Sequence, residues 1–182
     1  MKGYEYTQGF PLQEQIAGLN AHSVSSLHLG VSVRSFRAER LSEFIGLVIS
    51  NQSNEARALY TQINDKFPIF LTRNISTARN WLKDKARGSE LYGLIASSGG
   101  QRLKPDGVNV KAKISPKEWF LNGKDDVRSC HYLEDVATEF DVQGLELDWI
   151  GVCWDANLYW DGVSWVPRKF VVTKWQDIKI ER

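Results

Sequence analysis

The sequence has little cysteine and no long apolar run. Its two cysteines, Cys130 and Cys153, form neither a disulfide framework nor a metal-binding motif. No secretory signal peptide is present, so we expect reduced thiols and a cytoplasmic protein. No apolar stretch approaches the roughly 20 residues that a membrane helix needs, so we expect no membrane contact.

A phosphate-binding loop of the form Gly-x-x-x-x-Gly-Lys-Ser/Thr is also missing from the sequence. Ser97-Ser98-Gly99-Gly100 supplies glycines without the lysine, and we interpret it as an exposed turn. A global basic excess is missing too, because the net charge is +1. Any contact with nucleic acid would therefore depend on local arginines.

The remaining composition is that of an ordinary globular domain, with 182 residues, 42% of them hydrophobic and 25% charged. Apolar spacing of the helical kind alternates with short apolar runs. Helices are predicted over residues 41–49, 56–63 and 75–82. Strands are predicted over residues 27–33, 69–71, 91–96 and 147–153. A β-hairpin is predicted around Gly162, with 159–160 and 165–173 as its arms.

This alternation predicts an α/β fold with a mainly parallel sheet flanked by helices, followed by a C-terminal β-hairpin. Ligands of such sheets bind beyond the carboxyl ends of the strands. We therefore expect the loops that start at Arg34, Thr72, Ser97 and Asp155 to lie near one edge. Thr72 or Asn74 is expected to cap the third helix.

Five segments carry a resemblance to a known family. They are SVRSFRAERLSEF, FLTRNISTARNWL, YGLIASSGGQRLKPDG, WFLNGKDDVRS and ATEFDVQGLELDWIGVCWD. In this order they resemble a bacterial family of Schlafen-like DNA/RNA helicases of the superfamily 1 type, from about Leu27 to Trp175. Residues 1–26 contain glycines and serines with little periodicity, so we expect an irregular lead-in there. The resemblance implies a second RecA-like helicase domain at 27–182, truncated before the final arginine motif.

The resemblance also implies a set of nucleotide contacts. Val33-Arg34-Ser35 is similar to motif IV, whose arginine reaches the γ-phosphate, and Arg73 lies in the strand-to-helix element that follows. Motif V of these helicases resembles the stretch from Thr138 to Glu146. By this resemblance Glu146 accepts hydrogen bonds from the ribose hydroxyls, and Gly144 lets the backbone approach the ligand closely.

The same stretch implies contacts with nucleic acid through Thr138 and Gln143. Phe140 stands where the motif has histidine and Gln143 where it has lysine, so a phosphate-seeking charge is missing. We therefore expect weak binding of single strands. In the parent enzyme the cofactors would be ATP and Mg²⁺. This chain alone is expected to bind no cofactor. Its expected partner is a P-loop-bearing RecA-like domain.

Other interpretations stay open for these residues. Arg34 could pair with Glu39 or Glu43, Arg73 could satisfy loop carbonyls, and Arg128 is predicted to form an internal ion pair. The seven tryptophans are expected mainly to pack the core and the hairpin, with base stacking by Trp160 or Trp165 as the weaker alternative.

Two further classes of function compete with the helicase interpretation. The first is a Mg²⁺-dependent nuclease, because Glu146-Leu147-Asp148, a hairpin and Lys174 follow one another. Val172 occupies the position of the second acid, which disfavours that class. The second is a non-catalytic interaction module derived from a helicase domain, which the missing P-loop favours.

Overall fold

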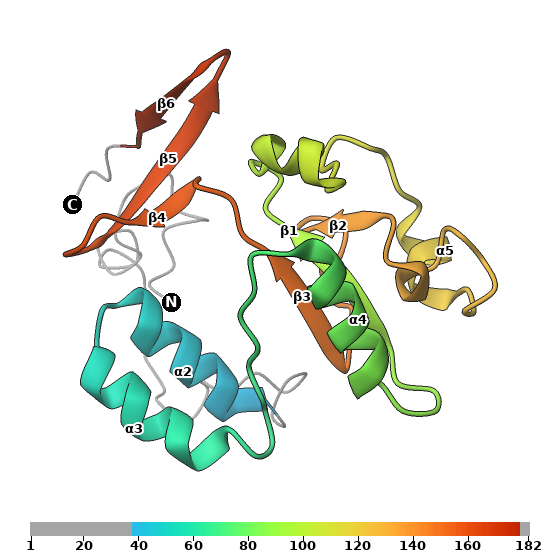
Figure 1. The fold of residues 1–182 in the computed structure, drawn as a ribbon, viewed down its shortest axis with the longest axis horizontal. Helices are drawn as coiled ribbons and strands as arrows, with labels where there is room; N and C mark the ends of the chain where they lie inside the picture. The colour runs from blue at the N-terminus through green and yellow to red at the C-terminus, as the bar shows by residue number, and fades with distance from the viewer. Residues whose placement is uncertain (1–37, 179–182) are drawn as a thin grey trace, which may run out of the picture.

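The computed structural model describes residues 38–178 (Figure 1). Its helices are α2 (Glu39–Ile49), α3 (Ser53–Ile63), α4 (Ile75–Lys85) and α5 (Pro116–Leu121), with short 3-10 helices at Gln101–Asp106 and Cys130–Tyr132. Its strands are β1 (Tyr92–Ala96), β2 (Val136–Thr138), β3 (Trp149–Cys153), β4 (Leu158–Trp160), β5 (Trp165–Val171) and β6 (Lys174–Asp177). None of the described helices is long and apolar enough to cross a membrane.

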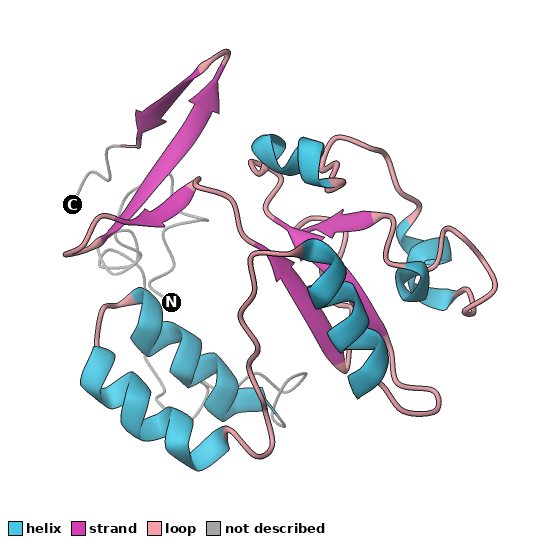
Figure 2. Ribbon diagram, viewed as in Figure 1, coloured by secondary structure: helices cyan, strands magenta, loops and turns pink. Residues whose placement is uncertain are grey.

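Three strands form a parallel sheet in the order β2-β1-β3, so β1 is central. Three more form an antiparallel sheet in the order β4-β5-β6. Figure 2 shows helices around the parallel sheet and the α2–α3 pair near the β4–β5 end of the antiparallel sheet. The 3-10 helix Gln101–Asp106 also contacts the antiparallel sheet, with the Arg102 guanidinium 5.1 Å from the Phe170 ring centroid. The predicted α/β fold with a parallel sheet, flanking helices and a C-terminal hairpin is confirmed.

The core lies on both faces of β1 because its side chains alternate. Tyr92 and Leu94 point toward α4 and join a buried cluster with Leu82. On the other face Trp119 of α5 packs with Cys130 and Ala137. Gly93 permits this approach, since a Cβ there would lie 2.7 Å from the Trp119 ring.

The helix starting at Ile75 follows its predicted cap. The Asn74 side chain accepts a hydrogen bond from the backbone N–H of Thr77 at 2.9 Å, and Thr72 Oγ1 accepts one from Asn74 N at 3.1 Å. Both side chains thus organise the turn before α4, which is a common use of these residue types at helix starts.

The strand predicted at 69–71 is wrong. This segment has no regular secondary structure and pairs with no described strand, and Leu71 is 89% exposed. Phe70 instead stacks on Trp81 with 5.5 Å between ring centroids, and Ile69 N donates to the Tyr60 hydroxyl at 3.3 Å. The apolar run therefore anchors a connection to α4. The predicted lead-in at 1–26, the strand at 27–33 and Arg34 lie outside the described residues.

Candidate functional site

The carboxyl ends of the three parallel strands meet at one edge of the sheet. Ala96 at the end of β1 is in register with Thr138 on one side and with Cys153 on the other. The loops that follow these strands therefore start side by side (Figure 1). This confirms the expected neighbourhood of the loops starting at Ser97 and Asp155, at the edge where ligands of parallel sheets bind.

The loop after β1 is a tight turn. Gly100 N donates to the carbonyl of Ser97 at 2.7 Å, and Gly99 N donates to Ser97 Oγ at 3.2 Å. The predicted turn is confirmed, but its predicted exposure is wrong, because Gly100 is buried and the three residues before it are half-buried. The neighbouring loops cover this turn, which local sequence cannot show.

Carboxylates tie the three loops together. Glu139, in the loop after β2, accepts from Ser98 Oγ at 2.7 Å and from Ser98 N at 2.8 Å. Asn157 Nδ2, in the loop after β3, donates to Ser97 Oγ at 2.9 Å, and Asp155 accepts from Arg102 N at 3.3 Å. The edge is thus a polar surface whose shape is fixed before any ligand arrives.

Two opposing effects act on the Glu139 carboxyl. Partial burial alone would raise the pKa of Glu139, but the hydrogen bonds from the Ser98 hydroxyl and backbone N–H outweigh it and lower that pKa. Glu139 is therefore ionised at neutral pH, and it uses its charge to hold the turn at Ser98.

Thr138 ends β2, and both of its donors are already bonded. Its backbone N–H and its hydroxyl donate to the same oxygen of Asp141, at 2.8 and 2.6 Å. The side chain is also buried. A phosphate could take the predicted contact with Thr138 only by replacing the Asp141 carboxylate.

The remaining residues of the predicted motif V loop lie further along the chain. Gln143 and Glu146 are exposed, and Gly144 has a φ of +81°, a conformation that favours glycine. Asp148 accepts from Leu91 N at 2.8 Å and so fixes the loop to the start of β1. Asp148 therefore orients the loop.

The loop separates Thr138 from Glu146. Glu146 precedes β3 and lies toward the amino ends of the strands, whereas Thr138 ends β2 at the opposite edge. The length of β3 puts these two positions about 13 Å apart along the sheet. The structure thus brings Gln143, Gly144 and Glu146 together in one exposed loop and leaves Thr138 at the far edge.

Among the predicted arginines, Arg73 is exposed immediately before the Asn74 cap. Arg79 carries a feature that the sequence did not reveal. Its Nε and Nη2 atoms are enclosed without a hydrogen-bond partner in the described part of the chain, and Nη2 lies 3.8 Å from Glu134. Helical spacing alone gives no sign of this, because its surroundings come from distant loops.

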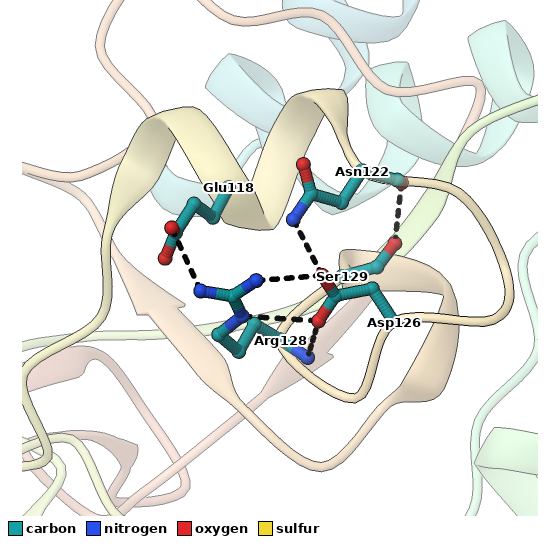
Figure 3. Close-up of polar contacts among 5 residues, drawn as sticks. All are labelled: Glu118, Asn122, Asp126, Arg128 and Ser129. Atoms are coloured by element: carbon teal, nitrogen blue, oxygen red, sulfur yellow. Dashed lines mark hydrogen bonds and ion pairs between the residues drawn. The ribbon is translucent and has the colours of Figure 1, made fainter.

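The predicted internal ion pair of Arg128 is confirmed (Figure 3). Arg128 Nη1 lies 2.7 Å from Glu118 of α5, and Nη2 lies 2.8 Å from Asp126. The same network includes Asn122, whose side chain donates to Asp126 at 2.7 Å. Hydrogen bonds from Arg128 lower the pKa of Asp126 far below its usual range. Arg128 therefore organises the loop after α5.

The residues of the nuclease hypothesis are spread over two sheets. Glu146 and Asp148 precede β3, whereas Val172 and Lys174 belong to the turn between β5 and β6 and to β6 itself. Among residues 38–178 no group of three or more His, Cys, Asp or Glu side chains is placed to hold a metal ion.

A parallel sheet with a loop-lined carboxyl edge is the general architecture of nucleotide-binding α/β domains. Over residues 1–182 the chain matches the family model described as "Schlafen group 3, DNA/RNA helicase domain", and the chain belongs to this family. The resemblance seen in its five segments is thereby confirmed at the level of the family. No curated protein and no solved structure matches the chain.

Proposed function

We propose that this chain acts as the second RecA-like domain of a superfamily 1 type helicase, contributing half of an ATP site and a contact surface for nucleic acid. Its membership in a DNA/RNA helicase family supports this role most strongly. A P-loop-bearing RecA-like domain would complete the ATP site.

The exposed loop of Gln143, Gly144 and Glu146 supports the nucleotide half of the proposal. An exposed carboxylate at Glu146 can accept hydrogen bonds from two ribose hydroxyls, and the backbone at Gly144 offers no side chain to block the approach. Arg34 and Arg73 are the proposed phosphate contacts. Gln143 and Thr138 are the proposed contacts with the nucleic-acid strand. At Thr138 the phosphate would replace the Asp141 carboxylate.

The chain alone should not hydrolyse ATP. Phosphoryl transfer needs the P-loop lysine, Mg²⁺ and a positioned water together, and this sequence has no P-loop. Steady-state assays with and without single-stranded DNA should therefore show background rates. Turnover that survives repurification and disappears in Glu146→Ala would contradict the proposal.

Nucleotide binding tests the half-site directly. The chain alone is not expected to retain ATP as a cofactor, but weak contact at high ATP concentration should shift the amide signals of residues 143–146 in ¹⁵N-labelled protein. The analogue 2′,3′-dideoxy-ATP should shift them less because it lacks the ribose hydroxyls. Glu146→Gln should reduce this discrimination, because the amide keeps one acceptor oxygen where the carboxylate has two. Asp84→Asn removes the same charge from an exposed position on α4 and serves as the control. Equal responses to both nucleotides in the wild-type protein would sink the proposed ribose contact and favour a non-catalytic interaction module.

A further inference from the structure

The antiparallel sheet has two faces of different chemistry. Strand register places Tyr159, Arg168 and Trp175 on one face, where the Arg168 guanidinium lies 3.6 Å from the Tyr159 ring centroid and 4.9 Å from that of Trp175. These three side chains are half-buried and occupied with one another. Their face is therefore packed.

The opposite face is open. Register places Trp160 and Trp165 on it, followed along the sheet by Lys169 and Lys174. Both lysines and Trp160 are exposed. We call these four residues the tryptophan–lysine face. The strand residues of this face include no carboxylate, whereas Asp177 lies on the other side. The face is therefore aromatic at one end and cationic at the other.

Hydrogen bonds and ring contacts hold three indole rings in place, of which Trp154 and Trp160 are exposed and Trp165 is half-buried. Trp165 Nε1 donates to the carbonyl of Val48 in α2 at 2.9 Å, and Trp154 Nε1 donates to the carbonyl of Leu158 at 2.7 Å. Trp154 and Trp160 flank the Trp165 ring at centroid distances of 5.7 and 5.5 Å, and they are 54% and 43% exposed. Rigid exposed rings can stack on a planar ligand at a low cost in conformational entropy.

A groove beside these rings has the size and lining for a nucleobase. It measures about 270 Å³ and is lined by Val48, Asn51, Ser53, Ala56, Trp160 and Trp165. Two indoles form an aromatic wall. The polar groups are the Ser53 hydroxyl and the Asn51 amide, whose Nδ2 donates to the carbonyl of Val163 at 3.1 Å. Single-stranded nucleic acids bind other proteins through this combination of aromatic stacking and nearby cations.

We propose that a single strand of nucleic acid binds the tryptophan–lysine face, with a base against Trp160 and the following phosphates at Lys169 and Lys174. Lys169 is four residues beyond Trp165 on β5, about 13 Å away, so a strand can reach both ends. The lysines favour a polyanion over an apolar peptide. This surface adds to the nucleic-acid contact of the proposed function. The inference rests on the proposed function only for the class of ligand, which is nucleic acid.

The test is fluorescence anisotropy with a labelled single-stranded oligonucleotide, for the wild-type protein and surface variants. We expect wild-type binding in the micromolar range and a loss of about 5-fold or more in Trp160→Ala. Trp160→Phe keeps an aromatic ring and should retain most of the affinity. This second variant separates stacking from a folding defect.

The lysines are tested by salt dependence. The Lys169→Ala/Lys174→Ala double variant should flatten the plot of log K against log salt by about 1.4, because each phosphate contact on a single strand contributes about 0.7. Lys113→Ala/Lys117→Ala removes the same charge from exposed positions near α5 and should leave the slope unchanged.

The outcomes separate this inference from the proposed function. If Trp160→Ala binds the oligonucleotide like the wild-type protein, and the two double lysine variants show the same salt dependence, the tryptophan–lysine face does not bind nucleic acid. If Gln143→Ala alone weakens binding, the motif V loop holds the strand and only the further inference fails. If Trp160→Ala weakens binding while ATP leaves residues 143–146 unchanged, the inference stands and the nucleotide half-site fails.

Discussion

The two sheets of this domain are stabilised in different ways. In the parallel sheet, every residue of β2 and all but one of the central strand β1 are buried, whereas the edge strand β3 has no buried residue. Helices α4 and α5 pack on the two faces of β1. In the antiparallel sheet, no residue of β4, β5 or β6 is buried. Aromatic contacts and Arg168 hold it together. Burial of apolar area dominates stability, so the parallel sheet should be the stable frame.

The polar groups of the two regions differ as well. At the carboxyl edge of the parallel sheet, Ser98, Thr138 and Asn157 already have protein partners. On the tryptophan–lysine face the Trp160 indole and the side chains of Lys169 and Lys174 are exposed. The polar groups at the carboxyl edge are therefore less accessible to a ligand than the side chains of the tryptophan–lysine face. Variants that affect one sheet and spare the other can test this division.

The largest effect is expected for Trp119→Ala. Trp119 is 1% exposed and its Nε1 donates to the carbonyl of Asp135 at 3.2 Å, so truncation leaves a large cavity and an unpaired carbonyl. We expect a loss of about 3–5 kcal/mol in the free energy of unfolding, measured with urea. Trp160→Ala should cost about 1 kcal/mol or less. Equal losses would contradict the division between the sheets.

A smaller effect is expected for Gly93→Ala. The added Cβ would lie 2.7 Å from Trp119 Cζ2 and 3.1 Å from Cys130 Cβ, inside a packed core. Overpacking of this kind costs about 1–3 kcal/mol in unfolding free energy. Gly123→Ala is the control, because no atom lies within 4 Å of its added Cβ. Urea denaturation of the two variants gives the comparison, and an unchanged stability in Gly93→Ala would mean that Trp119 moves freely.

Arg168→Gln should affect only the antiparallel sheet. It removes the stacking on Tyr159 and Trp175 and the hydrogen bonds from Nε and Nη2 to the carbonyl of Ala156. We expect a local loss of about 1 kcal/mol, seen as faster amide hydrogen exchange in β4–β6 with no change in β1. Lys169→Gln, its neighbour on the opposite face, should leave exchange unchanged. Faster exchange in β1 would show that the sheets unfold together.

The smallest effect concerns pH. Burial, with a contribution from Lys124, lowers the pKa of His131, which packs edge-on against Tyr92 of β1. On acidification the unfolded chain takes up a proton first, near its usual pKa of about 6.5. The contribution of His131 to stability is therefore complete above that pH and lost as pH falls toward the lower folded-state pKa. Urea titrations at pH 7.5 and 5.5 should show a smaller pH effect in His131→Gln, and an identical pH effect in both proteins would contradict this role.

Much of the frame could be predicted from the sequence because its signals are local. Asn74 caps α4, apolar runs mark β1 and β3, and Gly162 marks the hairpin. The three residues of β2 are too few for a recognisable pattern. The apolar run at 69–71 has the composition of a buried strand, but its neighbours along the chain cannot show that no strand pairs with it.

The candidate sites were less predictable, since they depend on register and on contacts between distant segments. The motif V resemblance identified the stretch from Thr138 to Glu146, but not that Asp141 occupies both donors of Thr138. The tryptophans were recognisable as a group, whereas their alignment with Lys169 and Lys174 follows from the pairing of β4, β5 and β6. Such pairing is a long-range property.

The central claim is that the parallel sheet is the stable frame and that the antiparallel sheet binds the single strand. Amide hydrogen exchange with and without a single-stranded oligonucleotide tests this claim most directly. Without ligand, we expect amides of β1, β2 and β3 to exchange slowly and those of β4, β5 and β6 to exchange faster. With ligand, protection should rise in β4–β6 and remain unchanged in the parallel sheet. Uniform protection across both sheets before ligand is added, or added protection at the parallel sheet alone, would contradict the account.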